Sequence, residues 1–510
     1  MKIIKSALTL LLAGSYLLAN AQDKRPNIVI IISDDHAYQT ISAYGSKYGK
    51  TPQIDRIAKE GAIFQNAFVN NSICGPSRAT LLTGKYSHKN GFRDNETSEF
   101  DFNQDSFVKR LQQGGYQTAW VGKIHLGHKL QGFNYFDILV DQGTYFNPDF
   151  ISAQGRKNSV GYVSDIITSK SLNWLDALSK KDPFCLVIGH KATHRTWMPD
   201  PKDFGSYDSV KFDLPATFYD DYASREAASL QEMSISKDMQ MGYDLKMFDN
   251  LEDMLKDGNF KRMNAEQQKA YIDYYRPKYN ELKKLNLSGK ALAEWKYKQY
   301  MIDYLNTAQS LDRNIGEVLD YLDAKNLTEN TLIIYLSDQG FYMGEHGWFD
   351  KRWMYEESFR TPMVMRYPAL IQAETTIKAN VVNADIAPTL LELAKIKIPT
   401  DMQGQSFVPV LTQSKKEHRK ELFYHYFENG EHAVSPHFGV RDDRYKLIRY
   451  YKRVQSWELF DLKKDPQEMK NVYKDKAYKK IVAQMKKKLQ AEIIKFDDSE
   501  AQQIFDNNID

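Results

Sequence analysis

Two apolar segments of the sequence end in side chains that carry oxygen. Asn27–Ser33 (NIVIIIS) and Thr331–Leu336 (TLIIYL) are continuous runs of the kind that form fully buried parallel strands. Carboxylate and amide oxygens are hard donors, which suit Ca²⁺ or Mg²⁺ and not Zn²⁺. An acid pair after one strand could cap a helix, but its recurrence at two strand ends favours a metal site. The four candidate ligands are Asp34, Asp35, Asp338 and Gln339.

The second candidate for chemistry is Cys74, one of two cysteines in the chain. Cys185 lies in the apolar run FCLVIG, which indicates a buried small hydrophobic residue. Cys74 lies instead in a polar turn, in the segment Cys74-Gly75-Pro76-Ser77-Arg78 that continues to Leu82-Thr83-Gly84. This segment resembles the signature of the type I sulfatases, C-x-P-S-R followed by L-T-G. The alternative is a free thiol in a loop that precedes a helix.

The resemblance implies that Cys74 is converted after translation to formylglycine. The hydrated aldehyde would use one oxygen to attack sulfur and the other to expel the sulfate, which splits one difficult hydrolysis into two easier steps. An oxygen of residue 74 would also bind the cation, which neutralises the sulfate and lowers the pKa of the diol. A helix that begins near Pro76 would direct its N-terminus at the anion. Arg78, one turn along, would hold the oxygens of the nucleophile and the sulfate.

The block Gly122-Lys123-Ile124-His125-Leu126-Gly127 resembles the G-K-x-H-L-G element of the same family. Alternate residues of an extended segment face the same way, so Lys123 and His125 are expected to reach one site. The resemblance implies that Lys123 contacts the sulfate. It also implies that His125 takes the proton that collapses the diol.

Two further basic residues are implied by the resemblance. Phe184–His194 (FCLVIGHKATH) resembles the strand that ends in the family's Pro-His pair, with Thr193 in place of the proline. If the match holds, His194 protonates the departing sugar oxygen, and His190 is the competing candidate. Lys351, in the run HGWFDKR, would bind the sulfate during its transfer.

Three segments look most like bacterial exo-acting sulfatases that remove 6-O-sulfate from N-acetylglucosamine in host glycans: DKRWMYEESFRTP at Asp350–Pro362, TFYDDYASREAA in the polar stretch after residue 200, and the C-terminal HAVSPHFGVRDDRYKL. We expect Asp350 and Arg352 to lie on either side of a sugar hydroxyl, with Asp350 as the hydrogen-bond acceptor and the Arg352 guanidinium as the donor. We also expect His437 to complete the pocket. A surface ion pair and an ordinary loop histidine are the alternatives. Another regiospecificity and N-sulfoglucosamine hydrolysis also remain open.

Two more distant functions compete with these. A phosphonate or phosphodiester hydrolase on the same scaffold commonly holds a transition metal with more histidine ligands, which the oxygen-rich set above argues against. An inactive carbohydrate-binding relative would show erosion of the site, whereas Cys74, Arg78 and both pairs of metal ligands are intact.

Strands alternate with helices along most of the chain, which predicts an α/β fold with a doubly wound, mostly parallel sheet. In such a sheet, ligands bind at the carboxyl ends of the strands. The resemblance implies an alkaline-phosphatase-like fold, in which helices sandwich a large sheet and a smaller C-terminal domain carries an antiparallel sheet and a packing helix. The other predicted elements are strands at Gln117–Val121, Phe184–Gly189 and Pro362–Tyr367 and helices at Val163–Leu178 and Ile386–Ala394.

The expected divisions are a signal peptide at 1–21, a catalytic domain at 22–415 and a C-terminal subdomain at 416–510. A polar stretch at about 201–294 has no clear strand and is expected to insert helices and loops, either as a pocket wall or as a peripheral elaboration. In the subdomain, antiparallel strands are predicted in Phe438–Tyr451 and Trp457–Leu462, and a helix at Lys476–Ile494.

The first 21 residues contain two lysines, an apolar stretch and a small-x-small end at Ala19 and Ala21. This pattern is typical of a secretory signal peptide and predicts export to the periplasm or beyond, without membrane insertion after cleavage. The 69 basic and 66 acidic residues give a net charge of +3, which argues against a nucleic-acid partner. The expected partners are a sulfated saccharide and the enzyme that matures Cys74.

Overall fold

The computed structural model describes residues 25–179 and 182–507 of the chain. The predicted signal peptide at 1–21 lies outside these residues. Among the helices that are described, none combines the length and the apolar character that a membrane crossing requires.

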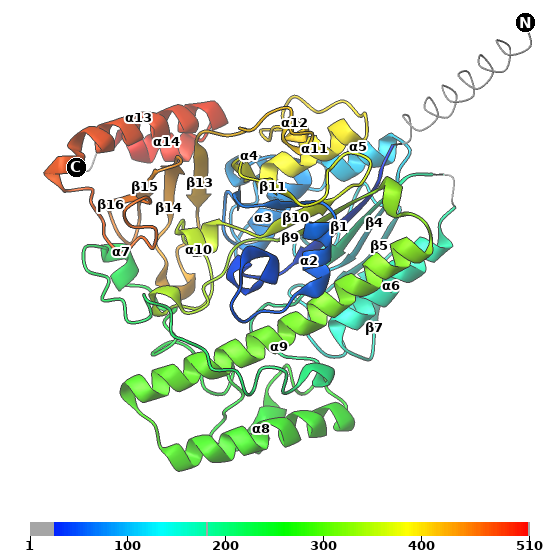
Figure 1. Cartoon of the computed structure of the whole chain (residues 1–510), viewed down its shortest axis with the longest axis vertical. Helices are drawn as coiled ribbons and strands as arrows, with labels where there is room; N and C mark the ends of the chain where they lie inside the picture. Colours follow the sequence, from blue (N-terminus) through cyan, green and yellow to red (C-terminus); the bar gives the residue numbers. More distant parts are fainter. Residues whose placement is uncertain (1–24, 180–181, 508–510) are drawn as a thin grey trace, which may run out of the picture.

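A ten-stranded mixed sheet forms the centre of the larger part of the molecule, in the order β11-β2-β10-β9-β1-β8-β4-β5-β6-β7 (Figure 1). The five neighbours β9, β1, β8, β4 and β5 are parallel, whereas β10 and β6 run antiparallel to β9 and β5. The mostly parallel sheet predicted from the sequence is confirmed. The bounds are β1 (Asn27–Ser33), β2 (Ala62–Phe64), β4 (Gln117–Gly122), β5 (Tyr135–Leu139), β6 (Asp149–Ser152), β7 (Gly155–Asn158), β8 (Phe184–Gly189), β9 (Thr331–Ser337), β10 (Met363–Arg366) and β11 (Thr375–Ile377).

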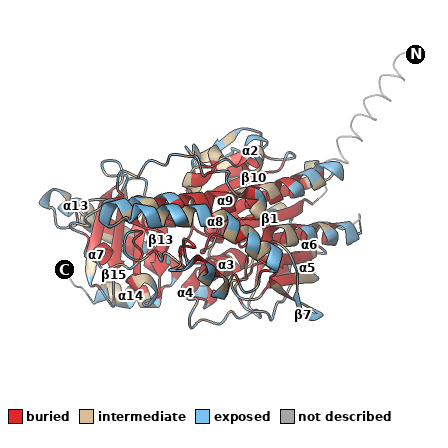
Figure 2. Ribbon diagram, turned by 90° about the horizontal axis from the view of Figure 1, so that it is seen from below, coloured by how far each residue is buried: buried red, intermediate tan, exposed pale blue. Residues whose placement is uncertain are grey.

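The residues of β1 divide between two hydrophobic cores. Ile28, Ile30 and Ile32 join one cluster, whereas Val29 and Ile31 join the other. Because successive strand residues point to opposite faces, a strand whose central residues are all apolar needs other elements to cover both faces. Figure 2 shows this buried sheet between partly exposed helices. One face packs on α2 (Pro52–Lys59), α6 (Val163–Ala177) and α9 (Gly289–Ala324), and the other on α3 (Cys74–Thr83), α5 (Phe107–Gln113) and α11 (Ile386–Leu393).

The C-terminal part is a four-stranded antiparallel sheet covered by a helix. Its strands are β13 (Leu422–Tyr426), β14 (His437–Arg441), β15 (Tyr445–Tyr450) and β16 (Ser456–Asp461), in that order. The predicted strand segment Phe438–Tyr451 is a hairpin, because the Asp442 carboxylate accepts from the main-chain nitrogens of Arg444 and Tyr445 at 2.9 and 2.7 Å and forms a turn there. Strand β13 was not predicted. The helix α13 (Lys479–Phe496) packs its Met485, Leu489 and Ile493 into the core of this sheet.

The stretch at 201–294 holds helices and irregular segments, with one isolated bridge from Ser234 to Trp348. Its largest helix, α8 (Ala265–Leu285), begins with a capping box in which Asn264 and Gln267 each accept from the other's main-chain nitrogen at 2.9 Å. Figure 1 shows α8 on the far side of α9 from the sheet.

Because β1 is buried on both faces, shortening the side chain of Ile30 is predicted to lower the free energy of unfolding strongly. This side chain is 0% exposed, so Ile30→Ala should lose about 2–5 kcal/mol of unfolding free energy through lost burial and the cavity left behind. Val160→Ala is the control, since Val160 is 73% exposed and the change should stay within about 0.5 kcal/mol. Urea unfolding of both variants measures the difference, and equal midpoints would contradict the assigned packing.

Candidate active site

Three aspartates meet where β1 and β9 end. The two strands are in register up to Ser33 and Ser337, so the residues that follow leave the sheet at the same level. Carboxylate oxygens of Asp34, Asp35 and Asp338 lie within 4.8 Å of one another, and all three residues are buried. The main-chain nitrogen of Asp35 donates to Asp338 Oδ1 at 3.1 Å, which links the two strand ends.

Three buried basic side chains face this acidic cluster, one for each carboxylate. Lys123 Nζ donates to Asp34 Oδ2. Lys351 Nζ lies 2.7 Å from Asp35 Oδ2. Arg78 donates from Nε and Nη2 to Asp338 Oδ2 at 3.0 and 2.9 Å. All three were predicted for the site. Lys123 follows β4, Lys351 lies in the loop after β9, and Arg78 lies in α3.

The pKa values of the buried Asp34 and Asp35 shift in opposite directions. Burial opposes ionisation of Asp34, but Lys123, His194 and Arg78 outweigh it and hold its pKa well below the usual value. Burial raises the pKa of Asp35 to about 7 even though Lys351 lies beside it, and the charges of Asp34 and Asp338 add to the rise. The three basic neighbours therefore do not fully offset the negative charge of the three carboxylates.

Unpartnered oxygens show that these residues fit a divalent cation. Among the described residues, no hydrogen-bond donor pairs with the buried Asp34 Oδ1 or with Gln339 Oε1. A buried acceptor without a partner costs about 1–3 kcal/mol, which a bound cation would offset. Gln339 Nε2 donates to Asp35 Oδ1, so its carbonyl oxygen stays free for a ligand. The predicted metal ligands therefore do converge.

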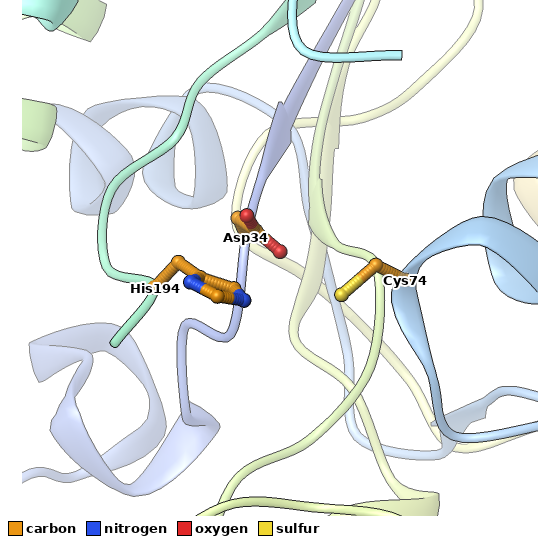
Figure 3. Close-up of side chains that lie close together, drawn as sticks. All are labelled: Asp34, Cys74 and His194. Atoms are coloured by element: carbon orange, nitrogen blue, oxygen red, sulfur yellow. The ribbon is translucent and has the colours of Figure 1, made fainter. Parts of the chain in front are cut away.

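A second group of possible ligands overlaps the first, because Asp34, Cys74 and His194 also bring one ligand atom each within 4.8 Å (Figure 3). Sulfur and imidazole donors suit Zn²⁺ better than Ca²⁺. The oxygen-only set has the larger number of hard donors.

Cys74 is the first residue of α3, two residues before the predicted helix start. Its neighbour Gly75 donates its main-chain N–H to Asn95 Oδ1 at 3.2 Å. A Cβ at position 75 would lie 2.5 Å from both this oxygen and a ring carbon of Phe92, so only glycine fits. Burial raises the pKa of the Cys74 thiol despite nearby Lys123 and Lys351. An unmodified thiol here stays neutral, which makes it a poor nucleophile.

Of the two candidate histidines, His194 is the one at the site. Figure 3 shows its ring directed toward Asp34 and Cys74. Its Nδ1–H donates to the carbonyl of Arg195 at 2.6 Å, and its Nε2 lies 3.9 Å from Asp35 Oδ2. His190 is fully buried, and neither of its ring nitrogens has a hydrogen-bond partner among the described residues.

Lys123 and His125 are brought together by Gln142 and not by strand alternation. The strand ends at Gly122, and His125 has a φ of 58°, outside the extended range on which the alternation argument depends. Gln142 Oε1 accepts from Lys123 Nζ, and Gln142 Nε2 lies 3.2 Å from His125 Nε2. Gln142 carries no motif signal and was missed in the sequence.

Asp350 and Arg352 lie beside Lys351, with φ values of 80° and 93° that turn the chain sharply. Asp350 Oδ2 lies 2.9 Å from His432 Nε2. Arg352 Nη1 donates to Glu428 and is 3.3 Å from the Tyr426 hydroxyl. Glu428 and His432, both from the segment that follows β13, were not predicted.

The expectation that His437 completes the pocket is wrong. Its side chain is 0% exposed, its Nδ1 pairs with the carbonyl of Ser435 at 2.8 Å, and its Nε2 accepts from the main-chain nitrogen of Met354 at 3.1 Å. The ring stacks on Tyr424 with centroids 5.4 Å apart. His437 is therefore a buried residue that links β14 to the segment after β9, and no ring nitrogen is left for a sugar.

The stretch at 201–294 supports the site from outside. Asp244 pairs with Arg195, and Lys246 Nζ donates to the carbonyls of Thr196 and Trp197 at 2.6 and 2.9 Å, which fixes the segment after His194. Glu232 exchanges hydrogen bonds with His432 through its main chain. This contact pattern favours a supporting wall over a peripheral elaboration.

Comparison with known proteins agrees with this site. The family model described as sulfatase matches residues 26–396, which is more than half of the chain. The model described as N-sulphoglucosamine sulphohydrolase, C-terminal, matches residues 344–495.

Individual relatives are similar over nearly the whole chain. The N-acetylglucosamine-6-O-sulfatase of Bacteroides thetaiotaomicron is 45% identical over 473 residues, which cover 90% of this chain and 84% of the relative. The solved structure of BT4656 in complex with its substrate D-glucosamine-2-N,6-O-disulfate has a TM-score of 0.91 and 43% identity, and covers 94% of this chain and 99% of that one.

A phosphonate monoester hydrolase of Agrobacterium radiobacter is also similar, with a TM-score of 0.67, 20% identity and coverage of 92% of this chain and 96% of that one. This likeness shows the fold alone. The family model and the 45% identical relative go further, and with the geometry above they show that the chain belongs to the sulfatase family and is a sulfuric ester hydrolase.

Proposed function

We propose that the chain removes 6-O-sulfate from a terminal N-acetylglucosamine of sulfated glycans, with Cys74 matured to formylglycine and a bound Ca²⁺, or less often Mg²⁺. The observation that carries the proposal is the position of Cys74, which is buried at the N-terminus of α3 and faces both His194 and the carboxylate of Asp34 at the end of β1. The name and the identity of the Bacteroides relative support the choice of sugar.

The metal would be held by Asp34, Asp35, Asp338 and Gln339 together with residue 74. When bound, it supplies positive charge that neutralises the sulfate and eases ionisation of the nucleophile. Formylglycine supplies the oxygen nucleophile that the neutral thiol cannot. The chain's own cations Arg78, Lys123 and Lys351 are buried donors around the same point, where low dielectric strengthens their attraction for an anion.

His194 is placed to donate a proton through Nε2. Its Nδ1–H is committed to the carbonyl of Arg195, so only Nε2 faces the site. In the neutral ring that atom carries no proton, and delivery therefore requires the imidazolium form. Burial lowers the pKa of His194 well below its usual value, although the charge of Asp34 acts in the opposite direction. We infer that this neutral histidine must gain a proton before it can donate one to the leaving sugar oxygen.

The sugar would lie between Asp350 and Arg352, with His432 in the place first assigned to His437. Asp350 is an acceptor held ionised, since Lys351, His432 and Arg352 outweigh the cost of its burial and keep its pKa well below the usual value. Asp350 and Lys351 are each only 5% exposed, so little of either side chain reaches solvent. A site this buried suits the end of a glycan better than its middle, which favours exo action.

N-desulfation is the second candidate. The C-terminal residues match a model described as N-sulphoglucosamine sulphohydrolase, and BT4656 has a substrate that carries both N- and 6-O-sulfate. The cations around Cys74 could hold the sulfuryl group of either an O-sulfate ester or an N-sulfamate, so the residues that orient the sugar ring would decide between them.

The signal-like segment at 1–21 supports export to the periplasm or beyond. Maturation of Cys74 implies a sulfatase-maturating enzyme as a partner. The domain division near 415 falls between the short helix Val408–Leu411 and β13, and it stays a prediction.

Replacing Cys74 tests the nucleophile. In protein produced with a maturating enzyme, Cys74→Ala should reduce hydrolysis of a sulfated monosaccharide to the uncatalysed background, because no oxygen nucleophile remains at position 74. Mass spectrometry of the wild-type peptide should show formylglycine there. Cys185→Ala is the matched control and should keep its turnover, since that thiol is buried in strand β8. Full activity of Cys74→Ala would contradict the proposal.

Removing the metal tests the oxygen-rich site. Exhaustive chelation should abolish turnover, and Ca²⁺ should restore it better than Zn²⁺, because the cluster offers carboxylate and amide oxygens. The readout is the initial rate after each addition. Undiminished hydrolysis after chelation, or recovery with Zn²⁺ alone, would speak against a calcium site.

Paired histidine variants test the sugar pocket on a panel of 2-, 3-, 4-, 6- and N-sulfated sugars. His432→Ala should lower kcat/KM for 6-O-sulfated N-acetylglucosamine about 10- to 100-fold, since a hydrogen bond to a charged group is worth about 1.5–3 kcal/mol. His437→Ala should instead lower the melting temperature and leave KM unchanged. Glu417→Ala, at an exposed position in the segment before β13, is the surface control. An unchanged kcat/KM in His432→Ala, or preference for another ring position, would remove His432 from the pocket or change the assigned sugar.

A further inference from the structure

Gln142, in the loop after β5, joins three basic residues at the edge of the site. Its Oε1 accepts from Lys123 Nζ. Its Nε2 lies 3.2 Å from His125 Nε2. Its main-chain carbonyl accepts from Lys191 Nζ at 3.1 Å. Both the side chain and the backbone of this residue are therefore held by lysine side chains.

The contact with Lys123 fixes the orientation of the Gln142 amide. An ammonium group only donates hydrogen bonds, so the atom of the amide that faces Lys123 must be the oxygen. A rotated amide would place an N–H₂ group against a positive charge. Lys123 itself is fully buried and is held in place by Asp34 on its other side.

The fixed amide then fixes the protonation of the His125 ring. Because the amide nitrogen faces His125 Nε2 and can only donate, this ring nitrogen must accept and carries no proton. The proton of the neutral ring is therefore on Nδ1. Burial, with the charge of Lys123, lowers the pKa of His125 well below its usual value, which is consistent with a neutral ring.

Nδ1 is the ring nitrogen of His125 that can contact a reacting group. Among the described residues, no group pairs with His125 Nδ1, although the atom is buried. A buried N–H without an acceptor is costly, so a group brought by the reaction is expected to supply one. Nε2 is unavailable unless Gln142 moves.

We propose that Gln142 is a positioning residue that holds His125 as the Nδ1–H tautomer, so that His125 acts as a hydrogen-bond donor through Nδ1. The expectation that the resting histidine takes a proton from the nucleophile is thereby revised, because Nδ1 is already protonated and Nε2 is engaged. The kinetic consequence rests on the proposed sulfatase mechanism, whereas the tautomer does not.

The tautomer is measured by ¹⁵N NMR of protein labelled at histidine nitrogens, since protonated and bare ring nitrogens resonate in separate ranges. The His125 signals are assigned by their loss in His125→Asn. Wild-type protein should show Nδ1 protonated and Nε2 bare. Gln142→Glu should reverse this pattern or charge the ring, because a carboxylate can only accept.

Kinetics of the matured enzyme provide the second readout. Gln142→Met keeps the length of the side chain but removes both polar contacts, and should lower kcat about tenfold or more with KM changed less than about threefold. Gln142→Glu should also lower kcat. Gln154→Met and Gln154→Glu, at an exposed turn between β6 and β7, are matched controls and should behave as wild type. Melting temperatures show whether any variant is merely unfolded.

The two proposals fail in different ways. A proton on Nε2 in wild-type protein, or an unchanged kcat in a folded Gln142→Met enzyme, would overturn the role of Gln142. Absence of sulfate ester hydrolysis in the matured wild type, together with the expected tautomer, would instead count against the substrate assignment and leave the positioning by Gln142 standing.

Discussion

The concentration of buried charge at the ends of β1 and β9 is the constraint on which the rest of the structure depends. Three carboxylates within 4.8 Å of one another cannot all ionise in a protein interior without opposite charge nearby. Lys123, Arg78 and Lys351 supply part of that charge. One oxygen each of Asp34 and Gln339 has no hydrogen-bond donor among the described residues, and the pKa of Asp35 is high. A divalent cation would supply the positive charge that is still missing.

The strand order and register of the large sheet bring these charged groups together. The parallel register of β1, β9 and β8 brings Asp34, Asp338 and the segment that leads to His194 to one edge of the sheet. The segment between β13 and β14 then joins the C-terminal part to this edge, because Glu428 pairs with Arg352 and His432 pairs with Asp350. Residues from several distant parts of the chain thus meet at one buried site.

The sequence predicted the groups that lie at strand ends or within contiguous motifs. Asp34 and Asp338 were predicted because each follows a continuous apolar run, and Cys74 and Arg78 because a short signature contains both; neither argument requires knowledge of tertiary contacts. His194 was found despite the replacement at Thr193. The two central strands were predicted for the same reason, since a continuous apolar run requires burial on both faces.

What the sequence missed depends on loop geometry. Gln142, His432 and Glu428 stand in no periodic pattern, and their roles appear only when the chain folds back on itself. His437 was misassigned because a histidine near a predicted strand gives no sign of whether its ring faces solvent or core. His125 reaches the site through a left-handed backbone turn, which the assumption of an extended segment could not anticipate.

A crystal structure of the matured protein grown with Ca²⁺ would test the central claim most directly. The account predicts one cation bound only through oxygen, about 2.3–2.6 Å from atoms of Asp34, Asp35, Asp338, Gln339 and the modified residue 74. A cation held by His194 nitrogen and an unmodified Cys74 sulfur, or ordered water alone among the carboxylates, would contradict it.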